Sequence, residues 1–454
     1  MNQTFTLKER INQIIILLLP ILVTQLGMFS MVFFNTIMSG KYNSADLAGV
    51  AIGASIWNPV FTGLSGILLA VSPIVAQRYG ERKKREVTIA VTHGILLAIL
   101  IAILVIACGA IFLNSILGYM NLDVRVEETA HEYLVGLGFG IIPLFIFNVL
   151  RSFIYGLGKT RVVMVILLLS LPINLFLNYV LIFGKLGFPE LGGGGAGFAT
   201  SVTYWVITGM IVYVIHKQKP FSKYQVFANL RRFSFEPCKE ILKIGVPMGL
   251  SAFFETSMFA VVTLLISKYS VETIASYQSA LNIVSFLYMI PLSVSMAQTV
   301  LVGYEVGAGR YRDAKSYSWL GVYLSVFIAL FAGGFIVLFR HEVASFYSNE
   351  AAVINLTAHF LIYALFFHIS DAIQVTAQAA LRGYKDVNIA FVMTLFAYWI
   401  ICLPVGYLLS HYLDLGARGY WIGLTIGLLA AGIGLSLRLI YIQRVKFVAR
   451  EVRV

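Results

Sequence analysis

The sequence predicts an all-α membrane protein with about twelve transmembrane helices in two pseudo-symmetric six-helix bundles. Of its 454 residues, 59% are hydrophobic and only 12% are charged, whereas a soluble domain carries about 25% charged residues. Apolar runs long enough to cross a bilayer recur along the whole chain. Basic residues gather in every second loop between these runs. These observations exclude a water-soluble protein.

The expected spanning segments fall into two sets of six, separated by the longest polar stretch of the chain. A spanning helix needs roughly 17–25 mostly apolar residues. The first set lies near residues 13–38, 47–76, 88–113, 132–157, 162–184 and 193–215. The second set lies near residues 241–266, 273–302, 317–339, 352–381, 388–410 and 419–441.

The distribution of basic residues predicts how the chain is oriented. If the helices alternate across the membrane, 27 of the 33 Lys and Arg residues lie on the side that holds both termini. Basic loops stay in the cytoplasm during insertion. We therefore expect a multi-pass protein of the cell (inner, cytoplasmic) membrane with both termini in the cytoplasm.

The two sets of segments predict four regions. These are an N-terminal six-helix lobe (1–216), a cytoplasmic linker (217–240), a C-terminal six-helix lobe (241–442) and a cytoplasmic tail (443–454). The lobes resemble each other weakly: Gly158-Lys159-Thr160 corresponds to Tyr384-Lys385-Asp386, and Gly80-Glu81-Arg82 to Ala308-Gly309-Arg310. Six helices separate each pair, so the repeats are parallel, and a substrate path is expected between them.

Two acids, Glu255 and Asp371, lie within apolar runs of the second lobe. An ionisable residue at such a position costs about 2.5–3.5 kcal/mol on insertion scales and is a functional candidate by default. No basic residue is expected at comparable depth. The acids should therefore bind a metal cation, a proton or a cationic substrate. The alternative is that both are structural acids that stay protonated.

Polar residues at helical spacing extend the candidate site. Asp371, Gln374 and Gln378 are spaced to form a polar face on one helix. The eighth run has a similar pattern that leads to Tyr288, and the first lobe offers amides in place of acids. The candidate cavity or substrate residues are Asn35, Gln25, Asn174, Asn178, Gln278, Asn282, Ser285, Gln374, Gln378 and His368. For the pair Asn174 and Asn178, bonding between helices without a role in the site is an equally good interpretation.

Several motifs along nearly the whole chain resemble the multidrug and toxic compound extrusion (MATE) family, most closely its bacterial NorM branch. They are Asn35-Thr36-Ile37-Met38-Ser39-Gly40, Gly158-Lys159-Thr160-Arg161, Pro172-Ile173-Asn174, Gly245-Val246-Pro247 and Leu381-Arg382-Gly383-Tyr384-Lys385-Asp386. The resemblance implies a V-shaped arrangement of two six-helix bundles and antiport of cationic drugs against sodium ions or protons. It also implies that Glu255 and Asp371 are cation-coupling acids and that Tyr288 is an aromatic residue of the same site.

One position departs from the family pattern, which places Asp where this chain has Asn35. An amide neither binds nor releases a proton in the physiological range. Two alternatives follow. The chain is an impaired variant, or it is a homologue that relies on the acids of the second lobe.

These observations predict a cation-coupled (Na⁺ or H⁺) antiporter that exports organic-cation drugs and toxic compounds by alternating access. We prefer Na⁺, with Glu255 and Asp371 as its ligands, because two carboxylates, a tyrosine and amide oxygens can surround it. The coupling ion is the only expected cofactor. The expected partners are cationic amphipathic small molecules and membrane lipids, with no nucleic acid and no second subunit.

Three other classes of membrane protein are alternatives to this prediction. A lipid-linked oligosaccharide flippase of related two-lobe architecture needs basic residues in its cavity to hold a pyrophosphate. An integral membrane enzyme needs a nucleophile–base pair or a metal motif at one membrane face, and neither pattern occurs in the sequence. A channel gives no reason for two repeated lobes.

Overall fold

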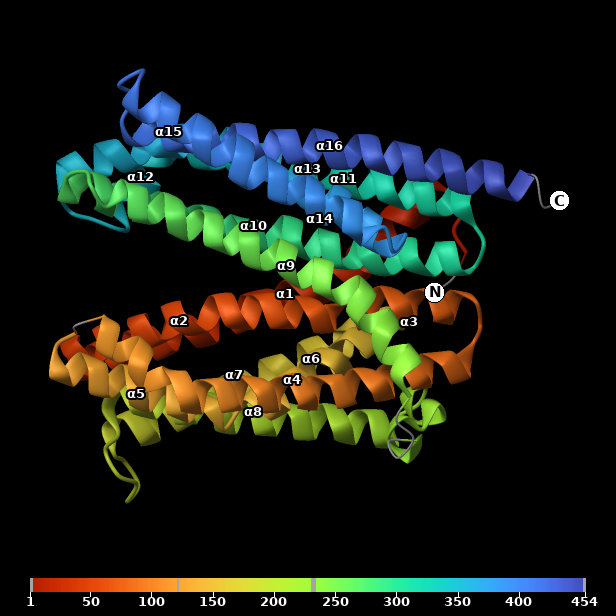
Figure 1. The fold of residues 1–454 in the computed structure, drawn as a ribbon, viewed down its shortest axis with the longest axis horizontal. Helices are drawn as coiled ribbons and strands as arrows, with labels where there is room; N and C mark the ends of the chain where they lie inside the picture. Colours follow the sequence, from red (N-terminus) through yellow and green to blue (C-terminus); the bar gives the residue numbers. More distant parts are fainter. Residues whose placement is uncertain (1–2, 121, 230–233, 452–454) are drawn as a thin grey trace. The chain divides into compact units, whose positions relative to one another are not determined.

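The computed structural model describes residues 3–120, 122–229 and 234–451, and these residues form helices joined by short turns (Figure 1). The first half contains α1 (Leu7–Tyr42), α2 (Ser44–Leu69), α3 (Val71–Gly80), α4 (Lys84–Tyr119), α5 (Val124–Gly138), α6 (Ile141–Gly156), α7 (Thr160–Phe183), α8 (Gly192–Lys217), η1 (Phe221–Tyr224) and η2 (Val226–Asn229). The second half contains α9 (Phe235–Ile266), α10 (Val271–Gly307), α11 (Tyr311–Leu338), α12 (Arg340–Ser345), α13 (Ala351–Gly383), α14 (Val387–Phe396), η3 (Ala397–Cys402), α15 (Leu403–His411) and α16 (Ala417–Glu451).

The number of spanning segments agrees with the sequence prediction. Among the described residues, 11 helical segments are long and apolar enough to cross a membrane. The pair α5 and α6, bent by 51° at a short break, raises this number to 12 if the pair forms one span. The structure therefore confirms an all-α membrane protein with about twelve spans.

Three of these spans are interrupted, and a proline follows each interruption. Pro73 lies in the first turn of α3, Pro143 in the first turn of α6, and Pro404 at the start of α15. Proline lacks the backbone N–H that continues a helix, but it is well tolerated in a first turn. The third interruption is η3, a π-helical segment, which shifts the direction of the side chains that follow it.

The chain divides into two compact units. Unit 1 comprises Met1–Leu22 and Leu250–Val454, and unit 2 comprises Val23–Gly249. The boundaries therefore fall inside α1 and α9. The division drawn from the sequence, at the linker 217–240, assigns the beginnings of these two helices to the other lobe. We call residues 7–22 the α1 arm and residues 235–249 the α9 arm.

The α1 arm is bonded to α11 within unit 1. Arg10 Nη2 donates to Asp313 Oδ1 at 2.7 Å. The Tyr317 hydroxyl donates to Gln13 Oε1 and also lies 2.8 Å from the Thr4 hydroxyl. Together these contacts hold the beginning of α1 on the second half of the chain.

The α9 arm packs closely on α2 within unit 2. A Cβ on Gly245 would lie 2.3 Å from the carbonyl oxygen of Ile67, and a Cβ on Gly249 would lie 2.3 Å from that of Gly63. Small residues four apart allow two helix backbones to approach this closely. The glycines therefore fix the α9 arm against α2.

Unit 1 has an aromatic core around Trp421 of α16, which is fully buried. Its indole ring lies 5.6 Å from the ring of Tyr277 on α10 and 5.8 Å from the ring of Phe367 on α13. Edge-to-face pairs of this kind add stability beyond the area they bury. The core fixes α10, α13 and α16 relative to one another and so positions the polar face of α13.

Two pairs of helix ends have the same backbone geometry in both repeats. Arg82 and Gly309 have φ of 61° and 72°, and Gly158 and Lys385 have φ of 71° and 61°. The members of each pair are 227 residues apart, as are Pro20 and Pro247. The turns thus recur at a spacing of 227 residues. The sequence pairing was wrong by one residue at both turns, because Arg82 and Lys385 each occupy a position that is glycine in the other repeat.

Candidate functional site

The two predicted cation-coupling acids lie in the same part of unit 1. Glu255 is on α9, beyond the arm, and Asp371 is near the middle of α13. The two carboxyl groups are close enough to interact electrostatically. Asp371 is only 2% exposed, whereas Glu255 is half-buried. Two carboxylates that share a site favour binding of a cation or of a proton.

The polar face of α13 is buried but poorly bonded. Both ring nitrogens of His368, Oδ2 of Asp371 and both amide atoms of Gln374 lack hydrogen-bond partners. Buried polar atoms in proteins are nearly always bonded to protein, water or a ligand. Water molecules or a bound ion can supply hydrogen bonds or ligands to this row of atoms.

Two tyrosines lie near the acids. Tyr288 of α10, which the sequence analysis selected, is close enough to interact electrostatically with both carboxyl groups. Tyr398, which it did not select, interacts with both as well, and its hydroxyl is close enough to Glu255 to hydrogen-bond with that carboxyl group. Tyr398 belongs to η3, and π-helical turns of this kind often occur at functional sites. The acids therefore have two phenol groups available as oxygen donors.

The expectation that no basic residue lies near the acids is wrong for Glu255. Arg382, in the last turn of α13, interacts electrostatically with Glu255 and Tyr288. Its Nη2 donates to Gln378 Oε1 at 2.7 Å. Gln378, the last residue of the polar face of α13, is therefore hydrogen-bonded. Arg382 directly follows the predicted apolar run 352–381, but a long side chain at a helix end can extend back toward the core.

The predicted polar row of α10 lies on an exposed face of that helix. Gln278, Asn282 and Ser285 are all exposed in the structure. Exposed polar groups on a spanning helix are unfavourable toward lipid, so they require a water-filled path or another protein surface. Their role in substrate binding stays a prediction.

The amides of the first lobe form a bonded network inside unit 2. Asn35 Nδ2 donates to Thr200 Oγ1 at 2.8 Å, and Asn35 Oδ1 accepts from Asn178 Nδ2 at 2.7 Å. Asn178 also donates to Asn174, whose own Nδ2 donates to Thr203 Oγ1 at 3.1 Å. The network joins α1, α7 and α8, which favours the interpretation that these amides hold helices together.

Gln25 lies outside this network, and its buried Oε1 has no partner. One turn further along α1, the sulfur of Met28 lies 3.3 Å from Nη1 of Arg151. Arg151 is 4% exposed, stacks over Phe147, and pairs with no carboxylate among the described residues. Arg151 is therefore a buried basic residue of α6 that the sequence analysis did not select.

Asp46, at the beginning of α2, is a buried acid that the sequence analysis did not select. Its carboxylate accepts the backbone N–H of Gly193 at 2.6 Å and a bond from Arg125 Nε at 3.1 Å. The Thr129 hydroxyl lies 3.5 Å away. Each oxygen is bonded, which is typical of a structural acid.

We call Glu255, Asp371 and the polar groups around them the acidic cluster. Its chemistry suits a hard cation that is bound by two carboxylates together with neutral oxygens. No group of three or more His, Cys, Asp or Glu side chains that could hold a metal occurs in the part of the chain that the structure describes. Carboxylate, amide and phenol oxygens are the donors that hard cations prefer. A metal ion bound at Glu255 and Asp371 would therefore need neutral oxygens, and Gln374, Tyr288 and Tyr398 carry such groups.

A model of the MatE family matches residues 20–180 and 247–408, once in each repeat. The chain belongs to the MatE family. The two MatE matches begin at Pro20 and Pro247, and this spacing is the 227-residue repeat of the helix ends.

Curated relatives agree with membership of the MatE family over the full length. The chain is 51% identical over 444 residues to a protein of Bacillus subtilis named "Probable multidrug resistance protein NorM", and the match covers 98% of each chain. A protein of the same name from Halalkalibacterium halodurans is 52% identical and covers 98% of this chain and 97% of its own. These matches confirm the resemblance to the NorM branch.

Solved structures of MATE transporters share the fold. A multidrug resistance MATE family transporter of the MOP superfamily superposes with a TM-score of 0.86 at 22% identity over 96% of each chain. A eukaryotic MATE transporter superposes with a TM-score of 0.85 at 21% identity, over 95% of this chain and 96% of its own. At this identity, the likeness establishes the fold of a MatE protein and no more.

Proposed function

We propose that this MatE protein is a cation-coupled antiporter that exports organic cations across the cytoplasmic membrane by alternating access. The observation that carries the proposal is the buried, unbonded polar face around Asp371 in a multi-pass membrane protein. The names of the relatives, probable multidrug resistance proteins, support drugs and other toxic cations as the cargo.

The coupling mechanism rests on differential affinity. A cation that binds the carboxylates of Glu255 and Asp371 favours one conformation, and an organic cation favours the other. Because the two ligands compete for the same negative charge, binding of one promotes release of the other. Arg382 moderates the charge of Glu255 and leaves Asp371 as the more strongly unpaired acid.

We propose sodium as the coupling ion, with protons as the alternative. The side-chain oxygens of the two acids, of Gln374 and of the two tyrosines favour binding of a small hard cation. A proton would need only one of the two carboxylates.

The test is transport by the purified protein in proteoliposomes. Uptake of a fluorescent organic cation such as ethidium is followed while a sodium gradient and a proton gradient are imposed separately. Drug movement driven by the sodium gradient alone, with the proton gradient collapsed, is the expected result. Movement driven only by the proton gradient would replace sodium with protons. Equilibration that neither gradient changes would overturn antiport.

The proposed orientation, with both termini in the cytoplasm, is tested by cysteine labelling in whole cells. The exposed Cys108 is first replaced by Ser, and single cysteines are then introduced at Arg82, Lys223, Lys41 and Arg340. An impermeant thiol reagent should label the positions of Lys41 and Arg340 and leave the other two unlabelled. The reverse pattern would contradict the orientation.

A further inference from the structure

A basic pocket lies between the beginning of α4 and the beginning of α9, within unit 2. Its volume is about 570 Å³. Its lining includes the basic residues Lys84 and Arg85, the hydroxyl residues Thr88 and Thr92, and the apolar residues Ile89 and Pro237. The pocket therefore combines positive charge, hydroxyl groups and apolar surface.

The positive charge of the pocket is not neutralised by nearby acids. The Lys84 ammonium lies 5.8 Å from the centre of the Tyr224 ring, and Arg85 pairs with no carboxylate among the described residues. His93, also in the lining, is held between two backbone groups, because its Nε2 accepts the N–H of Ser234 and its Nδ1 lies 2.8 Å from the carbonyl oxygen of Ile89. Two full positive charges remain.

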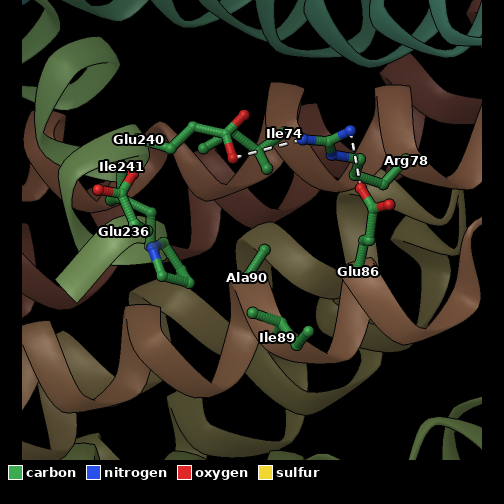
Figure 2. Close-up of a pocket in the computed structure, with 9 residues that line it drawn as sticks. Ile74, Arg78, Glu86, Ile89, Ala90, Glu236, Glu240 and Ile241 are labelled. Atoms are coloured by element: carbon green, nitrogen blue, oxygen red, sulfur yellow. Dashed lines mark ion pairs between the residues drawn. The ribbon is translucent and has the colours of Figure 1, made fainter. Parts of the chain in front are cut away.

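The adjacent pocket has the opposite polarity. It shares Ile89 and Pro237 with the basic pocket but is lined by Glu86, Glu236 and Glu240, and its volume is about 290 Å³. Figure 2 shows its single basic residue, Arg78, paired with Glu86 at 2.7 Å and with Glu240 at 3.5 Å. The acids thus gather on one side of the α9 arm, and the unpaired basic residues gather on the other.

The walls of the basic pocket are fixed by hydrogen bonds. The Thr88 hydroxyl donates to the carbonyl oxygen of Tyr224 at 2.7 Å, and that of Thr92 donates to the carbonyl oxygen of Val226 at 3.1 Å. With the bond from Ser234 to His93, these contacts hold η1, η2 and the beginning of α9 against α4. The pocket is therefore formed before any ligand binds.

The pocket also lies where α4 passes from polar to apolar residues. Lys84 and Arg85 are in the first turn, and the helix becomes continuously apolar beyond His93. This boundary is the level of lipid headgroups in a bilayer. Lysine and arginine bind phosphate oxygens, and basic pockets at the cytoplasmic ends of spanning helices bind anionic headgroups.

We propose that this pocket binds the phosphate headgroup of an anionic phospholipid, with Lys84 and Arg85 on the phosphate and Ile89 and Pro237 beside the glycerol and acyl chain. The bound lipid would connect α4 to the α9 arm. This site is separate from the acidic cluster of unit 1 and does not depend on the proposed transport activity.

The test measures thermal unfolding of the purified full-length protein in detergent with three additives. They are dihexanoyl phosphatidylglycerol, dihexanoyl phosphatidylcholine and inorganic phosphate. The anionic lipid should raise the unfolding midpoint by about 2–4 °C, and the other two should not. An equal shift with phosphatidylcholine would show an unspecific lipid effect, and an equal shift with phosphate would show a free-phosphate site. Either result would overturn the proposal.

Variants of the basic residues test whether the anionic lipid binds in this pocket. The double variant Lys84→Gln with Arg85→Gln should lose the shift caused by the anionic lipid, and Lys84→Arg with Arg85→Lys should keep it. Arg82→Gln is the matched control, because Arg82 is exposed in the turn just before α4 and is not part of the lining. The proposal fails if the double Gln variant folds and keeps the full shift, or if Arg82→Gln loses it.

Discussion

Each unit buries an aspartate, and the two aspartates differ in how they are bonded. Asp46 of unit 2 is fully buried and accepts bonds from Arg125 and from the backbone of Gly193. Asp371 of unit 1 is almost as deeply buried, yet its Oδ2 has no partner and it interacts electrostatically with another acid, Glu255. Burial alone therefore does not distinguish a structural acid from a functional one.

The hydrogen-bond inventory makes that distinction. A carboxylate whose lone pairs are used stabilises the fold, whereas one whose lone pairs are unused carries a cost that only a bound ion, a proton or water removes. The same contrast between bonded and unbonded polar groups separates other parts of the two units. The amides of unit 2 bond one another, whereas the polar face of α13 in unit 1 is left open. The comparison predicts separate effects on stability and on transport.

The largest expected effect is the loss of coupled transport in Asp371→Asn. The amide cannot hold the negative charge on which coupling depends, so gradient-driven drug transport should fall by about 100-fold. Stability should stay the same or increase, since a buried charge is removed. Transport is measured in proteoliposomes and stability by thermal unfolding. Asp414→Asn, on an exposed turn of the same unit, is the matched control. Normal transport in Asp371→Asn would show that Asp371 is a structural acid, as Asp46 is.

The reverse pattern is expected for Asp46→Asn. The new amide group cannot accept the Gly193 N–H and the Arg125 bonds together, so the free energy of unfolding should decrease by about 2 kcal/mol. Transport per folded molecule should not change. Denaturant unfolding gives the first quantity, and uptake normalised to folded protein gives the second. A large loss of normalised transport would place Asp46 in the mechanism.

A smaller effect is expected when unit 2 receives an acid by Asn35→Asp. While the new carboxyl group is protonated, it can donate to Thr200 and accept from Asn178, as Asn35 does, but once it is ionised it cannot donate. The variant should match the parent at acidic pH and depart from it as pH rises, with transport raised by about 5-fold. The measurement is the pH profile of uptake. Asn43→Asp, at an exposed helix cap, is the matched control. Identical profiles would exclude α1 from coupling.

The smallest effect concerns the arms. The ion pair between Arg10 and Asp313 is half-buried and short, whereas that between Glu240 and Arg78 is longer, at 3.5 Å. A double-mutant cycle on unfolding should give a coupling energy of about 0.5–1 kcal/mol for the first pair and less for the second. Equal energies would show that the two arms are held alike.

Hydrophobicity predicted the spans well, because length and apolar content directly determine which segments cross a bilayer. It did not predict where spans break. The residues on both sides of the α5–α6 bend and of η3 are apolar, and Pro143 and Pro404 are compatible with either a kink or a new helix start. The contacts that decide between these outcomes are between helices distant in sequence.

The candidate site was predictable along single helices but not between them. Helical spacing correctly placed Asp371, Gln374 and Gln378 on one buried face of α13, which His368 also joins. The approach of Arg382 and Tyr398 could not be predicted, because it depends on an extended side chain and on a π-helical turn. Likewise, spacing could not reveal that the polar row of α10 is exposed and that Asn35 is bonded.

The arms have a consequence for biosynthesis. Unit 1 combines the first 22 residues of the chain with residues 250–454, so the part made first belongs with the part made last. Arg10 and Gln13 leave the ribosome long before Asp313 and Tyr317, their bonding partners, exist. Until α11 has entered the bilayer, the beginning of α1 must remain there without its partners. A gene cut within the linker 217–240 would encode two fragments, neither of which contains a whole unit.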